Sequence, residues 1–155
     1  LLLPQLKIKW PNDILSRRKK ISGILIENII KSSGNSYAVI GIGLNVNQIF
    51  FDDDFKASSL KNILEKHFDL DALLMSIVLE LQNQIAVLKA GKFEQLHDFY
   101  ENQLFRKNKP STFRNTEGVL FSGIISGVTN YGKLKVLLED DIIQEYSLKE
   151  LALMY

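Results

Sequence analysis

The spacing of apolar residues changes along the chain, from a period of two to a helical period and back again. Residues 6–10 alternate apolar side chains with lysines, the pattern of a half-buried strand, and Pro11 removes the backbone donor that would continue it. The apolar stretches 21–30 and 37–46 follow, separated by the turn-forming residues 32–35. Two such stretches around a short turn predict a long antiparallel hairpin.

Helical spacing begins near residue 59. Residues 59–67 predict a short helix with Ser58 or Ser59 as its cap. Residues 71–89 repeat leucine, isoleucine and valine at helical intervals and predict a second, longer helix. Apolar and aromatic residues between 93 and 104 predict a third helix.

From Pro110 onward the pattern returns to short strands. These are predicted at residues 119–128, 133–138, 142–147 and 151–154. Several short strands separated by turns are typical of a small β-barrel. The predicted fold class is therefore α+β: a mixed or antiparallel sheet with helices packed on it, followed by a small C-terminal barrel. The boundary is expected near residues 107–109, which divides the chain into domains 1–107 and 108–155.

Composition narrows the class of protein. The chain has 155 residues, of which 46% are hydrophobic and 24% charged, so it can fold around a core. A net charge of +1 argues against a general binder of nucleic acid or of membrane surfaces. No uninterrupted apolar run reaches the ~18 residues that a bilayer span needs. The absence of cysteine fits a reducing compartment, and we expect a cytoplasmic protein.

Candidate chemistry begins directly after the first strand. Pro11 fixes a turn that directs Asn12 and Asp13 back across the sheet edge, either as turn residues or as groups of a site. The basic run 17–20 follows, and it is either a solvated loop or part of an anion site. Its last member, Lys20, directly precedes a strand, so its ammonium has a fixed base and suits a phosphate or a developing oxyanion.

Glycines and one asparagine interrupt the apolar strands. Gly23, Gly41 and Gly43 indicate either close approach of a ligand or another backbone, or a bulge or tight packing beneath a helix. The spacing is not a dinucleotide fingerprint, because the third glycine and the helix that follows it are missing. Asn45 either satisfies backbone groups or binds a polar ligand such as adenine. The acidic residues 52–54 lack the remainder of a calcium loop.

Taken together, these segments resemble a known family. "KWPNDI" at 9–14, "KISGILIE" at 20–27 and "GIGLNVN" at 41–47 resemble the central signature of the biotin protein ligases, or biotin–[acetyl-CoA-carboxylase] ligases, in the expected order. "ASSL" at 57–60 resembles a weaker element of that family. The resemblance continues at lower specificity through the helices into the C-terminal barrel, and it implies part of a class II synthetase-like catalytic domain.

The resemblance implies a reaction in two steps. Biotin and ATP form biotinyl-5′-AMP and pyrophosphate with the assistance of Mg²⁺. A lysine amine on a biotin carboxyl carrier protein domain then displaces AMP. Lys20 would be the catalytic lysine, and Asp13 would assist the metal or the amine. The implied biotin-binding residues are Lys20, Gly23, Ile24, Leu25, Gly41 and Ile42, and the implied adenylate-binding residues are Asn12, Lys20 and Asn45.

The chain also departs from the family pattern. The glycine- and arginine-rich loop that precedes "KWPND" in the family, the first strands of the sheet and a winged-helix DNA-binding segment are not found in these residues. Residues 147–155, "SLKELALMY", carry no arginine where some members direct one to the nucleotide. We therefore expect an N-terminally incomplete portion of a ligase. With biotin, ATP and Mg²⁺ it should release little pyrophosphate, and robust turnover by the 155-residue chain alone would contradict this.

Other interpretations remain. A lipoate or octanoate transferase-type enzyme would share the fold and a catalytic lysine, although "KWPND" with "GIGLN" favours the biotin branch. A non-catalytic fragment that docks on a carrier domain, or forms a homodimer through an exposed sheet edge, is the second. A nucleic-acid-binding barrel is disfavoured, because residues 119–155 contain only three lysines and no arginine.

Overall fold

The computed structural model describes residues 3–31, 36–52 and 54–155. The predicted turn at residues 32–35 and the middle of the acidic segment 52–54 lie outside the described residues. The chain divides into two compact units, Leu1–Ala86 and Val87–Tyr155. The domain boundary expected near residues 107–109 stays a prediction.

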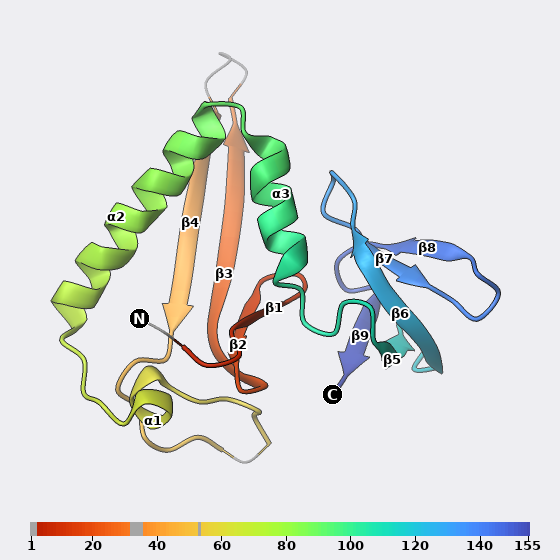
Figure 1. Ribbon diagram of the computed structural model, residues 1–155, viewed down its shortest axis with the longest axis horizontal. Helices are drawn as coiled ribbons and strands as arrows, with labels where there is room; N and C mark the ends of the chain where they lie inside the picture. The colour runs from red at the N-terminus through yellow and green to blue at the C-terminus, as the bar shows by residue number, and fades with distance from the viewer. Residues whose placement is uncertain (1–2, 32–35, 53) are drawn as a thin grey trace. The chain divides into compact units, whose positions relative to one another are not determined.

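The first unit is built on an antiparallel sheet of four strands in the order β1-β2-β3-β4. These strands are β1 (Lys7–Lys9), β2 (Asp13–Ser16), β3 (Lys19–Ile30) and β4 (Ser36–Leu44). Pairing between β3 and β4 runs without a register shift from Ser22↔Leu44 to Ile30↔Ser36 (Figure 1). The structure thus contains the long hairpin that the two apolar stretches predict.

Strand β2 is a correction to the sequence prediction, which gives a turn at residues 11–13, no strand at residues 13–16, and a basic run at residues 17–20 that is either a solvated loop or part of an anion site. Instead, Ser16 pairs with Lys19, so only Arg17 and Arg18 connect β2 to β3. Both arginines have positive φ, 47° and 65°. Two-residue hairpin turns of this kind normally carry asparagine and glycine. The turn is therefore invisible to a search for the usual turn residues.

Helix α1 (Leu60–Leu64) begins at its predicted cap, Ser59. The Ser59 hydroxyl accepts a hydrogen bond from the Asn62 amide at 3.1 Å and donates one to the Gln48 carbonyl at 2.6 Å. The helix is shorter than the predicted 59–67, because Glu65 adopts a left-handed conformation with φ 54° and ends it.

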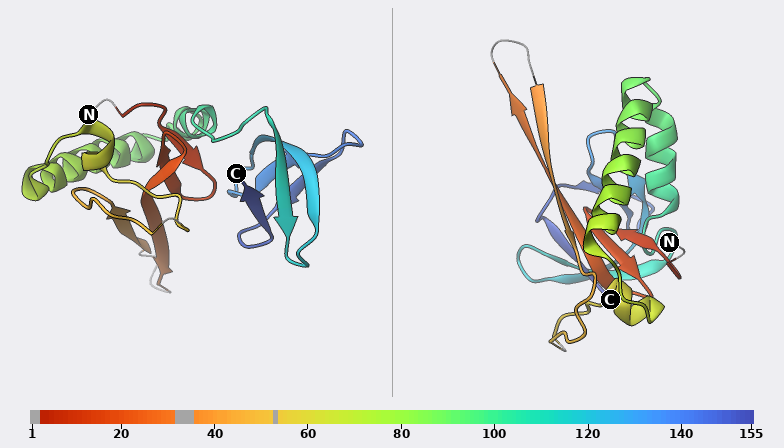
Figure 2. Two further views of the ribbon diagram at one scale, coloured as in Figure 1. Left: turned by 90° about the horizontal axis from the view of Figure 1, so that it is seen from below. Right: turned by 90° about the vertical axis from the view of Figure 1, so that its left-hand side faces the viewer.

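Helix α2 (Leu70–Lys89) lies along β4 on one face of the sheet (Figures 1 and 2). Apolar side chains from both elements line an open groove of about 380 Å³. By length and composition alone, α2 is also apolar enough to cross a membrane. The sequence analysis did not predict this, because it considered only uninterrupted apolar runs. None of its residues is buried, and the groove between α2 and β4 is open.

The second unit combines a helix with a five-stranded antiparallel sheet in the order β8-β7-β6-β5-β9. Its elements are α3 (Phe93–Asn102), β5 (Pro110–Asn115), β6 (Leu120–Val128), β7 (Leu134–Leu137), β8 (Ile143–Tyr146) and β9 (Leu151–Met154). Phe113 and Val136 are fully buried in its core, and Phe121 stacks between Phe113 and Tyr146. The α+β class with antiparallel sheets is confirmed.

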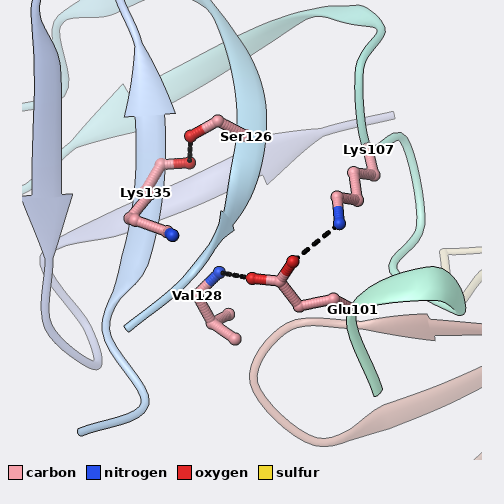
Figure 3. Close-up of polar contacts among 5 residues, drawn as sticks. All are labelled: Glu101, Lys107, Ser126, Val128 and Lys135. Carbon is pink, nitrogen blue, oxygen red and sulfur yellow. Dashed lines mark hydrogen bonds and ion pairs between the residues drawn. The ribbon is translucent and has the colours of Figure 1, made fainter. Parts of the chain in front are cut away.

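A partly buried carboxylate joins α3 to the strands of this unit (Figure 3). Glu101 accepts hydrogen bonds from the Lys107 ammonium at 2.7 Å and from the Val128 amide at 2.8 Å. Burial opposes ionisation, but these two bonds and the charges of Lys107 and Lys135 together lower the pKa of Glu101. Gly127 provides the space, since a Cβ atom there would collide with the Glu101 carboxylate.

Candidate functional site

The predicted site residues Asp13 and Lys20 meet across the β2–β3 hairpin. The Lys20 ammonium lies 2.6 Å from the Asp13 carboxylate, and the Lys20 side chain is 46% exposed. A second lysine, Lys9, lies 4.0 Å from the other carboxylate oxygen. An exposed ammonium held by one carboxylate is oriented and still accessible to an anionic ligand.

The backbone of Lys20 is fixed by a segment that lies far from it in sequence. The Lys20 amide donates to the Lys56 carbonyl at 2.7 Å, and the Ser58 amide donates to the Lys20 carbonyl at 2.9 Å. Lys20 and Ala57 thereby form an isolated parallel bridge. Lys56 and the start of the "ASSL" segment thus support the base of the Lys20 side chain, a role for Lys56 and Ser58 that no local sequence signal indicates.

Gly23 lies beside the ion pair. It lies opposite Asp13 in the β2–β3 register. A Cβ atom at this position would lie 3.4 Å from the Lys20 Nζ atom and 3.6 Å from Asp13 Oδ1. The register irregularity in this hairpin falls at Ile21 instead, between the pairs Ile14↔Ser22 and Leu15↔Lys20. The irregularity therefore does not lie at Gly23 itself, and close approach of a ligand to Gly23 stays a prediction.

The two asparagines bond to nearby backbone. The Asn12 side-chain amide donates to the Ile24 carbonyl at 2.6 Å, and the Ile24 amide donates back to the Asn12 carbonyl at 3.0 Å. The Asn45 side-chain amide donates to the Ser58 carbonyl at 3.1 Å. Asn12 therefore holds the backbone at Ile24, and Asn45 holds the backbone at Ser58, which bonds to Lys20. Contact of either side chain with an adenylate stays a prediction.

The predicted biotin-binding residues divide between two faces of the sheet. Gly23 approaches the ion pair, and Leu25 with its partner Gly41 lies on the same face because side chains alternate along a strand. Ile24 and its partner Ile42 face the opposite way, and Ile42 lines the groove under α2. A single pocket formed by all of these side chains stays a prediction.

The metal role of Asp13 has no cluster of ligands to support it. Among residues 3–31, 36–52 and 54–155, no group of three or more histidine, cysteine, aspartate or glutamate side chains is placed to hold a metal ion. Asp13 contributes one carboxylate, and that carboxylate is already paired with Lys20.

Comparison with known proteins identifies the family to which this site belongs. The model of the biotin/lipoate A/B protein ligase family matches residues 4–47, the stretch that contains Asp13, Lys20 and Gly23. The bifunctional ligase/repressor BirA of Bacillus subtilis is 30% identical over 147 residues, 92% of this chain. The chain belongs to the biotin protein ligase family. It spans 45% of the length of that relative.

Further members agree with the assignment. The biotin–[acetyl-CoA-carboxylase] ligase of Mycobacterium tuberculosis is 35% identical over 78 residues, which cover 50% of this chain and 27% of that one. The biotin protein ligase of Aquifex aeolicus in complex with biotin and ATP is 25% identical, with a TM-score of 0.75 over 96% of this chain and 62% of that structure. The Aquifex aeolicus structure thus shares its fold with nearly all of the present chain.

Proposed function

We propose that this chain is part of an enzyme that attaches biotin to a lysine of a biotin carboxyl carrier protein domain, with ATP as the energy source. The observation that carries this proposal is the Lys20 ammonium, held at 2.6 Å by Asp13 beside the bare backbone of Gly23. The ligase of Aquifex aeolicus has been solved with both biotin and ATP, which supports these substrates.

The proposed chemistry begins with attack of a biotin carboxylate oxygen on the α-phosphorus of ATP. A phosphorus–oxygen bond forms, the bond to the departing pyrophosphate breaks, and biotinyl-5′-AMP results. The ε-amine of the carrier lysine then attacks the biotinyl carbonyl carbon, loses a proton, and AMP leaves. Negative charge develops on phosphate and carbonyl oxygens in these steps, where a positioned ammonium such as Lys20 is most effective.

Mg²⁺ is the third component of the proposal. When bound, it would neutralise phosphate charge. A single carboxylate is a normal protein contribution for Mg²⁺, which keeps waters and takes most other ligands from substrate phosphates. Asp13 would supply that single carboxylate while it also orients Lys20.

Binding of biotin tests the proposal without depending on turnover. Titration calorimetry of the 155-residue chain should detect biotin, and lipoate should fail to compete with labelled biotin. Preferential binding of lipoate would instead support the lipoate or octanoate branch. Absence of binding for both ligands would contradict a ligand site at Lys20 in this chain.

A graded series at Gly23 tests the space beside the ion pair. Alanine places its Cβ at ordinary contact distance from Lys20 Nζ, 3.4 Å, and should reduce biotin affinity little. Valine adds two further carbons and must displace the ammonium, so we expect biotin affinity to fall roughly tenfold, the loss of about half of a charge-assisted hydrogen bond. Thermal unfolding should show both variants folded. Equal affinities for wild type and valine variant would contradict the assignment.

A second candidate function, self-association through the sheet edge, is favoured by strand β4. This nine-residue edge strand, "SYAVIGIGL", has no charged residue, and Val39 and Tyr37 are each 53% exposed. Uncharged edges promote pairing between chains. A homodimer in solution, detected by light scattering as a mass that rises with concentration and falls in an Ala38→Lys variant, would support it.

We also infer a cytoplasmic location.

A further inference from the structure

The turn between β2 and β3 carries positive charge in an unusual setting. Arg17 and Arg18 form the whole turn, each with positive φ, and Lys19 follows as the first residue of β3. Left-handed backbone disfavours an arginine and favours glycine or asparagine. Other non-glycine residues of this chain, such as Glu65, share this conformation, so the case for a function of the two arginines rests on their exposure and charge.

The three side chains are not used within the part of the chain that the structure describes. Arg17, Arg18 and Lys19 are exposed, and no ion pair or side-chain hydrogen bond links them to any described residue. The nearest acid in the hairpin, Asp13, is committed to Lys20 and lies near Lys9. Three uncompensated cations thus stand together on a chain whose net charge is only +1.

The base of this hairpin is fixed, so the charges are presented in a defined place. Ser16 is fully buried, and its hydroxyl donates to the Pro4 carbonyl at 2.7 Å. On the other strand, the Lys20 backbone is bonded to Lys56 and Ser58. A tight turn on such a base loses little conformational freedom when it binds a partner.

We propose that Arg17, Arg18 and Lys19 form a docking point for the protein acceptor, which would present acidic residues beside its target lysine. This inference rests on the proposed function, since the acceptor is the carrier domain of the second step. A tight turn with exposed side chains suits contact with another surface, whereas a phosphate group is normally held in a concavity lined by backbone amides. Because Lys19 directly precedes Lys20, an acceptor bound at this turn would lie near the Lys20–Asp13 ion pair.

The sharpest test replaces Arg17→Asn and Arg18→Gly together, the residues that this backbone conformation prefers. The double variant should keep or raise the thermal midpoint and should retain wild-type affinity for biotin. Its affinity for an immobilised apo biotin carboxyl carrier domain with acidic residues beside its lysine should fall about fivefold to tenfold at low salt. The wild-type affinity should weaken with added salt, as expected for exposed charges.

Arg114→Asn is the matched control, because Arg114 is an exposed arginine on β5 and should leave carrier affinity unchanged. Equal carrier affinity in wild type and double variant, an equal loss in the control, or no carrier binding by the wild type would overturn the inference. A loss of affinity for tripolyphosphate, with carrier binding intact, would overturn it in favour of a phosphate site. Biotin titration of the same proteins tests the proposed function separately, so either can fail alone.

Discussion

Replacing Lys20 by alanine is expected to slow formation of biotinyl-5′-AMP roughly 100- to 1,000-fold, the usual effect of removing one group that stabilises developing negative charge. The ammonium is the group that Asp13 orients at 2.6 Å, whereas the neighbouring Lys9 ammonium lies farther from that carboxylate, at 4.0 Å. Biotin-dependent exchange of labelled pyrophosphate into ATP measures formation of biotinyl-5′-AMP. The comparison is made in a form of the protein that catalyses this exchange.

Two comparisons make this result specific. Lys19→Ala removes the adjacent exposed charge and should leave pyrophosphate exchange unchanged. In the 155-residue chain, affinity for a non-hydrolysable biotinyl-adenylate analogue should fall about tenfold or more in Lys20→Ala, the value of one hydrogen bond between charged groups. An unaffected exchange rate, or equal losses in the Lys19 and Lys20 variants, would refute the assignment of Lys20.

The second large effect is expected on stability. Glu101→Ala should lower the free energy of unfolding by about 3 kcal/mol, because it leaves the Val128 amide and the Lys107 ammonium without their shared partner. Chemical denaturation at neutral pH measures the loss. Glu145→Ala is the control, since the Lys133–Glu145 pair is long, 3.9 Å, and both side chains are about half exposed, 46% and 51%. Surface pairs of that kind contribute little.

The pH dependence of stability gives an independent signature of Glu101. Its pKa is lowered on folding, so its charged form contributes stability above the unfolded value of 4.5, and this contribution disappears as the pH falls through the lower folded value. The difference in unfolding free energy between wild type and Glu101→Gln should therefore be largest at neutral pH and shrink in acid. A difference that is constant down to pH ~3 would show that charge is not the cause.

Some residues of the candidate site could be predicted from the sequence, because both their type and their position in the chain are unusual. Lys20 and Gly23 were selected because a lysine at the start of a strand and a glycine within it are unusual, and three ordered motifs linked them. The sequence places Lys20 directly before the strand, whereas in the structure β3 begins at Lys19 and Lys20 is its second residue. The structure brings both to Asp13. The support from Lys56 and Ser58 could not be predicted, because those bonds involve backbone groups, which every residue possesses.

The fold was predictable to a similar degree and for similar reasons. Long apolar stretches and helical periods identified the β3–β4 hairpin and helix α2, since burial imposes those patterns. Strand β2 was missed because four residues are too few to establish a period and because arginines occupy its turn. The end of α1 at Glu65 was missed for the same kind of reason, a left-handed residue that is not glycine.

The contact between Glu101 and Gly127 also restricts how this chain can change over generations. Any side chain at position 127 would displace the carboxylate while glutamate remains at 101, and shortening Glu101 first would give up its bonds to Lys107 and Val128. Either substitution made first is therefore harmful. Once Glu101 has been shortened, however, a larger residue at position 127 costs little more. Related sequences that carry a larger residue at 127 should therefore lack glutamate at 101, and we expect the two positions to covary.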